Sequence, residues 1–181
     1  MSIWFTSDTH FWHANVIAYC NRPYQTVSEM NERLVENWNQ AIRPDDTVYH
    51  LGDFTLAGQG QAKVYFARLN GRIFVVPGGH DKHWISKGEY LSKSGHPVMI
   101  LPPLQTIKVS IPDLDKPQVL VLCHYAMRVW DRSHYRSWHL YGHSHGNLPP
   151  FPNSLDVGVD NWEYVPISLG RVVNEISEKD K

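Results

Sequence analysis

The chain has 181 residues, a formal net charge of −1 and hydrophobic residues at 42% of its positions. This length predicts one domain, residues 1–181, with enough apolar residues to bury a core without covalent cross-links. The near-neutral charge gives no reason to expect non-specific binding to DNA or to an acidic membrane. The two cysteines form no CxxC pair, and neither a signal peptide nor a membrane-spanning run is visible, so we expect a soluble, cytoplasmic protein.

The first half of the chain is expected to alternate strands and helices. Thr26 and Glu29 have capping-box spacing before a run with apolar residues every four positions, and Pro44 follows that run. The expected elements are a strand at 3–7, a helix at 27–41, a strand at 47–51, a helix at about 61–69 and a strand at 72–76. In the second of these helices the candidate buried positions are Val64, Phe66 and Leu69.

The second half is mostly strand-like. Short apolar runs are separated by turns that contain proline, and a short helix is expected from about Leu169. The expected strands are 98–101, 105–111, 118–123, 138–141, 154–159 and 164–168. Alternation followed by a strand-rich half predicts a mixed sheet system with helices on its outer faces.

Clusters of Asp and His follow the apolar runs, so that each is expected at the C-terminal end of a strand. They are Asp8-Thr9-His10, Gly52-Asp53, Gly78-Gly79-His80-Asp81, His124 and Gly142-His143-Ser144-His145. Carboxylates and imidazoles gathered in this way can bind divalent transition metals, which activate water and hold phosphoryl oxygens. A single such cluster occurs by chance in many proteins, but this ordered set predicts a two-metal site.

The clusters resemble the motifs of the calcineurin-like metallophosphoesterase superfamily, which run D-x-H, G-D, G-N-H-D, a later H and G-H-x-H. The resemblance spans Asp8 to His145 and is close to the small single-domain bacterial and phage members. Residues 6–15 resemble the opening of those proteins, and residues 156–160 resemble their closing strand. The resemblance implies an α/β fold, a four-layer α-β-β-α sandwich with two mixed β-sheets flanked by helices.

The resemblance also implies roles for individual residues. The first metal would be held by Asp8, His10, Asp53 and His145, and the second by Asp53, His124 and His143. His80 would stand beside the scissile phosphate as a general acid or as a donor to a phosphoryl oxygen, and Asp81 would orient that imidazole. The cofactors would be two divalent transition metals, with Mn²⁺ as our first choice and Fe, Ni, Co and Zn left open.

Position 79 departs from the family pattern, because it holds Gly where the family has an Asn whose amide oxygen ligates the second metal. We expect the loop to keep its shape, since Asn tolerates a positive φ and Gly adopts one freely. The second metal site would then be weakened, use another ligand, or be inactive.

Some residues outside the clusters have two interpretations. His13 faces substrate or is merely near the metal loop, and Arg22 clamps a phosphate or pairs with a surface carboxylate. We assign both to substrate binding. His50 and His139 are expected to be structural.

The expected function is metal-dependent hydrolysis of a phosphoester, with a metal-bridging hydroxide attacking phosphorus in line. A phosphodiester is favoured because no lid insertion is visible. The alternatives are a phosphomonoesterase, a protein phosphatase, a nuclease, which should show a basic track, or a non-catalytic interaction module that has lost a ligand at Gly79. The oligomeric state is left open.

Overall fold

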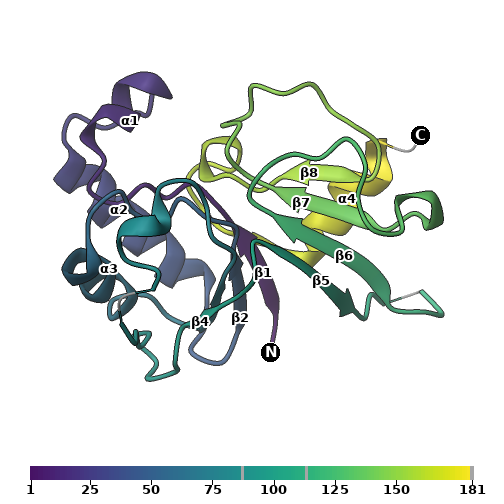
Figure 1. Cartoon of the computed structure of the whole chain (residues 1–181), viewed down its shortest axis with the longest axis horizontal. Coiled ribbons are helices and arrows are strands. Elements are labelled where there is room, and N and C mark those ends of the chain that lie inside the picture. Colours follow the sequence, from purple (N-terminus) through teal and green to yellow (C-terminus); the bar gives the residue numbers. More distant parts are fainter. Residues whose placement is uncertain (87, 113, 180–181) are drawn as a thin grey trace.

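Two mixed β-sheets pack face to face in the computed structural model, which describes residues 1–86, 88–112 and 114–179 (Figure 1). The first sheet has the order β4-β3-β2-β1-β9. Its strands are β1 (Ile3–Thr6), β2 (Thr47–His50), β3 (Arg72–Val75), β4 (Met99–Ile100) and β9 (Ile167–Ser168). Strands β1 to β4 run parallel, and β9 pairs antiparallel with β1.

The second sheet has the order β5-β6-β7-β8, in which only the pairing of β5 with β6 is antiparallel. Its strands are β5 (Leu104–Val109), β6 (Gln118–Cys123), β7 (Trp138–Tyr141) and β8 (Ser154–Asp156). Short 3-10 turns lie at Asp81–His83, Ser133–Tyr135 and Val159–Asn161.

Three helices lie beside the first sheet and enclose one core with it (Figure 1). They are α1 (Ala14–Tyr19), α2 (Val27–Ala41) and α3 (Gln59–Phe66). The predicted cap of α2 is present, because the Thr26 hydroxyl accepts the Glu29 N–H at 3.1 Å. From α2, Met30, Leu34 and Trp38 are buried against Val48 of β2.

A second core lies between the two sheets, where Phe5 and Leu51 meet Leu120 and Leu140. Helix α4 (Leu169–Lys179) contributes Val172 and Ile176 to this core and contacts β1, β8 and β9. The opposite face of the second sheet carries His139, whose ring lies 5.2 Å from that of Trp130. A loop residue therefore packs on this face of β7.

The predicted α/β sandwich of two mixed sheets with helices is confirmed. The helix at 27–41 matches α2, whereas α1 was not predicted. Helix α3 runs from Gln59 to Phe66 and not from 61 to 69, and its buried residues are Ala62, Tyr65 and Phe66. The prediction that Val64 is buried is therefore wrong, because 51% of this residue is exposed. The expected strands at 98–101, 154–159 and 164–168 are shorter in the structure.

The two histidines expected to be structural are buried. His50 Nε2 lies 3.0 Å from the Thr9 hydroxyl, and His139 donates from Nδ1 to the Val121 carbonyl at 3.0 Å. Among the described residues there is no helix with the length and apolar character that crossing a membrane requires.

The parallel strands bring the Asp and His clusters to one place. Asp8, Asp53 and His80 follow the C-terminal ends of β1, β2 and β3, while His124 and His143 follow β6 and β7. Backbone hydrogen bonds join these loops, from Asp8 N–H to the Gly52 carbonyl (3.0 Å) and from Gly142 N–H to the His124 carbonyl (2.9 Å). Ligands bind beyond this end of the strands in many open α/β sheets.

Candidate metal centre

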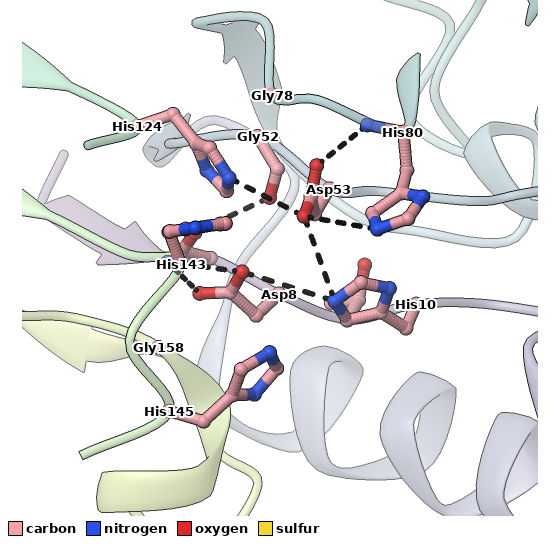
Figure 2. A network of polar contacts seen from close by, with 12 residues as sticks. Asp8, His10, Gly52, Asp53, Gly78, His80, His124, His143, His145 and Gly158 are labelled. Carbon is pink, nitrogen blue, oxygen red and sulfur yellow. Dashed lines mark hydrogen bonds and ion pairs between the residues drawn. The ribbon is translucent and has the colours of Figure 1, made fainter. Parts of the chain in front are cut away.

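The predicted ligands converge from both sheets (Figure 2). Among the described residues, four groups bring one ligand atom per residue within 4.8 Å of the others, and two of these groups consist only of predicted ligands. The first ligand group is Asp8, His10 and His145, and the second ligand group is Asp53, His124 and His143. Residues that are far apart in the sequence are therefore brought together as the motifs predicted.

Within the second ligand group, Asp53 is the residue that faces the first group, and it lies between His124 and His10 in Figure 2. Its Oδ2 is 3.3 Å from His124 Nε2 in the second ligand group and 3.7 Å from His10 Nε2 in the first. Its Oδ1 accepts the backbone N–H of His80 at 2.9 Å, which holds the carboxylate in this orientation. Asp53 is thus placed to contact ions in both groups.

Two buried ring nitrogens indicate that this set fits a metal. Within the described residues, Nε2 of His10 and Nε2 of His124 are buried and make no hydrogen bond. The other nitrogen of His124 donates to the Leu51 carbonyl at 2.7 Å, which leaves the lone pair of Nε2 facing Asp53. Buried polar atoms are rarely left unpaired, and imidazole held in this way by a backbone carbonyl is typical of metal ligands. A divalent ion in each ligand group would satisfy these two nitrogens.

The electrostatics of the site also suit a cation. Burial raises the pKa of Asp8 to about 7, against the opposing influence of His124 and His145. Burial likewise lowers the pKa of His10 well below its usual value, which favours the neutral, ligating imidazole. Burial opposes the charged form of Asp53 as well, yet His124 and the His80 N–H hold the pKa of this carboxyl below its usual range. Buried carboxylates of this kind are stabilised by nearby positive charge.

Most of the predicted ligands sit on strained backbone. Left-handed φ angles occur at Asp8 (59°), His10 (51°), Asp53 (56°), His143 (67°) and His145 (47°). Such angles are uncommon for residues other than Gly and cluster at functional sites, where the surrounding structure enforces them. Here the left-handed angles turn the loop backbone so that side chains two residues apart, such as Asp8 and His10, both point toward the ligand groups.

The glycines of the motifs allow the loops to approach closely. Gly52 has φ +91°, and a Cβ there would lie 2.5 Å from the Gly78 nitrogen and 2.8 Å from His124 Nδ1. A Cβ on Gly142 would collide with the Ser7 hydroxyl and with the Asp8 carboxylate. Any side chain at either position would push a predicted ligand away.

Arg22 supports the first ligand group from behind. It is 3% exposed, and its guanidinium donates to both carboxylate oxygens of Asp160 at 2.8 Å each. It also donates to the carbonyls of Asp8 (2.7 Å) and Thr9 (3.1 Å). Asp160 in turn accepts from Nδ1 of His145 at 2.6 Å.

This burial corrects the assignment of Arg22 to substrate binding. The guanidinium is occupied by protein acceptors and has no surface from which to clamp a phosphate. The other interpretation, a pair with a carboxylate, holds, although that carboxylate belongs to Asp160, whose side chain is only 7% exposed, and is not a surface group. Asp160 was missed as a contributor to the site, and its only signal was the resemblance of residues 156–160 to a closing strand.

Asp81 also has a different role from the one predicted. It is fully buried and accepts the backbone N–H groups of Gly78 (2.8 Å), Asp53 (2.8 Å) and Phe54 (2.9 Å) and the indole N–H of Trp84 (3.0 Å). These donors engage both oxygens, so Asp81 ties two loops together and does not orient the His80 imidazole.

His80 and His13 lie beside the first ligand group. The His80 side chain is 42% exposed, and its Nε2 lies 3.9 Å from Asp53 Oδ2, so Asp53 is the carboxylate that faces it. His13 Nδ1 lies 3.2 Å from His10 Nδ1, and its ring is 5.7 Å from that of His80. His13 therefore contacts a predicted ligand and lies near the His80 ring. Its role at the substrate stays a prediction.

Gly79 does not have the positive φ that we expected of it. The backbone therefore does not by itself favour Gly over Asn here. A Cβ on Gly79 would lie 3.1 Å from the Tyr125 hydroxyl, a contact that requires one of the two to move. The space that an amide side chain would need is limited by this phenol.

Comparisons with known proteins identify the family of this chain. A family model described as calcineurin-like phosphoesterase matches residues 1–162. The chain is 34% identical to the uncharacterized protein MJ1445 of Methanocaldococcus jannaschii, over 99% of this chain and 93% of that protein. It is 26% identical to the Gene 66 protein of Mycobacterium phage D29, over 98% of both. The protein of unknown function AQ665 from Aquifex aeolicus shares the fold, with a TM-score of 0.71 at 23% identity, over 97% of this chain and 98% of that one. The chain belongs to the calcineurin-like phosphoesterase family.

Proposed function

We propose that this protein is a phosphoester hydrolase that uses two divalent metal ions. The observation that carries the proposal is the position of Asp53, whose Oδ2 faces an unpaired buried imidazole nitrogen from each side. Membership of a phosphoesterase family supports the same chemistry. We assign Asp8, His10, Asp53 and His145 to one ion and Asp53, His124 and His143 to the other.

Bound divalent ions would supply an activated water and positive charge for the phosphoryl oxygens. Two dications against the two carboxylates of the ligand set leave a net positive site, which suits an anionic substrate. The exposed imidazole of His80 is the group that we assign to protonate the leaving oxygen or to donate to a phosphoryl oxygen. Its loop is held by the hydrogen bond from its own N–H to Asp53.

We favour a phosphodiester over a monoester because the site is open. His143 is exposed and the His80 side chain is 42% exposed, which leaves room for a second substituent on phosphorus. The mixed oxygen and nitrogen ligands suit Mn²⁺ and also Fe, Ni, Co and Zn. A single domain over residues 1–181 and a cytoplasmic location remain part of this proposal.

Hydrolysis of bis-p-nitrophenyl phosphate and p-nitrophenyl phosphate by metal-free protein, with each metal added back in turn, tests the proposal. We expect turnover of the diester with at least one metal and little without. Asp53→Asn should abolish turnover, whereas Asp45→Asn, at an exposed carboxylate paired with Arg72, should leave it unchanged. Absence of turnover of both substrates with every metal would instead support a non-catalytic module.

A further inference from the structure

The hydroxyl of Tyr125 lies where a side chain at position 79 would begin. An ideal Cβ on Gly79 is 3.1 Å from Tyr125 Oη, and no other non-neighbouring atom of the described chain lies within 4 Å of that Cβ. Tyr125 comes from the end of β6 and Gly79 from the loop after β3. The phenol therefore reaches from the second sheet to the loop that carries His80.

The ring of Tyr125 packs against the second ligand group. Its centroid is 4.8 Å from that of His124 and 4.8 Å from that of His143, with interplanar angles of 75° and 68°. These edge-on contacts fix the ring between two predicted ligands. The ring contacts thus hold the hydroxyl beside the second ligand group, although 48% of the residue is exposed.

A phenol brings a property that the ligand set lacks. The carboxylates and the ligating imidazole nitrogens offer only lone pairs toward a bound ion, whereas a tyrosine O–H can donate a hydrogen bond. Within the described residues the Tyr125 hydroxyl makes no hydrogen bond to a protein group, so its donor is available to a bound molecule. A phosphoryl oxygen accepts such bonds well, because it is charged.

We propose that Tyr125 is a substrate-binding residue whose hydroxyl donates a hydrogen bond to a phosphoryl oxygen beside the second ligand group, and that Gly79 provides the space for it. The inference depends on the proposed function, since it takes a metal-bound phosphoester as the occupant. It also gives Gly79 a role of its own, because a Cβ at this position would lie 3.1 Å from the hydroxyl, so that an Asn would require the phenol or the loop to shift.

Two titrations separate this proposal from its alternatives. Mn²⁺ is titrated into metal-free protein, and inorganic phosphate is then titrated into the Mn²⁺-loaded protein, both by calorimetry. For Tyr125→Phe we expect an unchanged Mn²⁺ isotherm and a loss of phosphate affinity of about tenfold or more, as for a lost hydrogen bond to a charged group. Tyr135→Phe, at a residue that is 77% exposed on the Ser133–Tyr135 turn, should change neither isotherm.

Gly79→Asn adds an independent arm. It should weaken phosphate binding in the wild-type background but have little further effect in Tyr125→Phe, because both changes remove the same contact. Unchanged phosphate affinity in Tyr125→Phe would overturn the proposal, and so would a weakened Mn²⁺ isotherm, which would make Tyr125 a metal ligand. A wild-type protein that binds no Mn²⁺, Fe²⁺, Ni²⁺, Co²⁺ or Zn²⁺ would refute the metal centre itself, a failure distinct from either result.

Discussion

Replacing Arg22 by Met separates the two roles that the sequence left open for this residue. In the structure its side chain is 0% exposed and forms an ion pair with Asp160. It also donates hydrogen bonds to the carbonyls of Asp8 and Thr9. Methionine fills part of the volume but leaves Asp160 buried without its cation. The damage should therefore appear first as lost stability.

The size of the effect follows from the burial of the pair. Removing one partner of a buried ion pair costs about 3–5 kcal/mol, because the remaining charge is uncompensated. For a domain of this size each kcal/mol lowers Tm by about 2–4 °C, so Tm should fall by about 6–20 °C. Metal affinity should fall by about 10–100-fold as well, since Asp160 orients the His145 imidazole.

Differential scanning calorimetry and Mn²⁺ titration of the same samples measure both effects. Arg33→Met is the matched control, because Arg33 pairs with Glu36 on an exposed face of α2 and its side chain is 62% exposed. That change should alter stability by no more than about 0.5 kcal/mol. If Arg22→Met keeps the wild-type Tm and Mn²⁺ affinity but raises KM, Arg22 is a phosphate clamp and our reasoning from burial is wrong.

Three further predictions concern the ions and the loops that hold them. Mn²⁺ at about 100 times its Kd should stabilise the protein by about 2.7 kcal/mol, or about 5–11 °C in Tm, and a chelator should reverse the shift; an unchanged Tm would count against the metal centre. Gly142→Ala should lower the free energy of unfolding, measured by chemical denaturation, by about 1–3 kcal/mol, because the new Cβ clashes with Ser7 and Asp8. Gly60→Ala, in open space on α3, is the control and should be neutral or stabilising. Equal effects of the two changes would refute the packing argument. Asp81→Asn should cost about 1–3 kcal/mol in the same assay, because an amide N–H would face backbone donors; lost kcat with unchanged stability would restore the predicted role at His80.

The features of the site that could be predicted from the sequence are those that depend on local sequence patterns. Asp8, Asp53 and His124 each follow an apolar run, and parallel strands place the residues after such runs at one edge of a sheet. The pattern of runs also predicts a mixed sheet system with helices on its outer faces, whereas the two packed sheets were implied by the family resemblance. Helix α2 could be bounded because its cap, its period and its following proline agree.

The residues that were misjudged depend on partners far away in the chain. Arg22 and Asp160 are separated by 138 positions, and nothing near either residue indicates the other. Asp81 stands next to His80 in the sequence, yet its oxygens are taken by N–H groups of other loop residues. Neighbours in a motif are not always neighbours in space. Val64 was misjudged for a smaller reason, because the buried stripe of α3 is formed by Ala62, Tyr65 and Phe66 at spacings i, i+3 and i+4, and Val64 lies outside it.

The misjudged residues explain how the ligand loops keep their shape. Left-handed backbone at non-glycine positions costs on the order of 1–3 kcal/mol each, so the loops bearing Asp8 and Asp53 need support from elsewhere. In the first of these loops Arg22 donates a hydrogen bond to the Asp8 carbonyl, and in the second Asp81 accepts one from the Asp53 N–H. Each support is a buried charged group that hydrogen-bonds to the backbone of a ligand loop, so it fixes loop geometry whichever ion is bound. The ligands are therefore arranged before an ion arrives, which is the condition for tight binding by a small set of side chains.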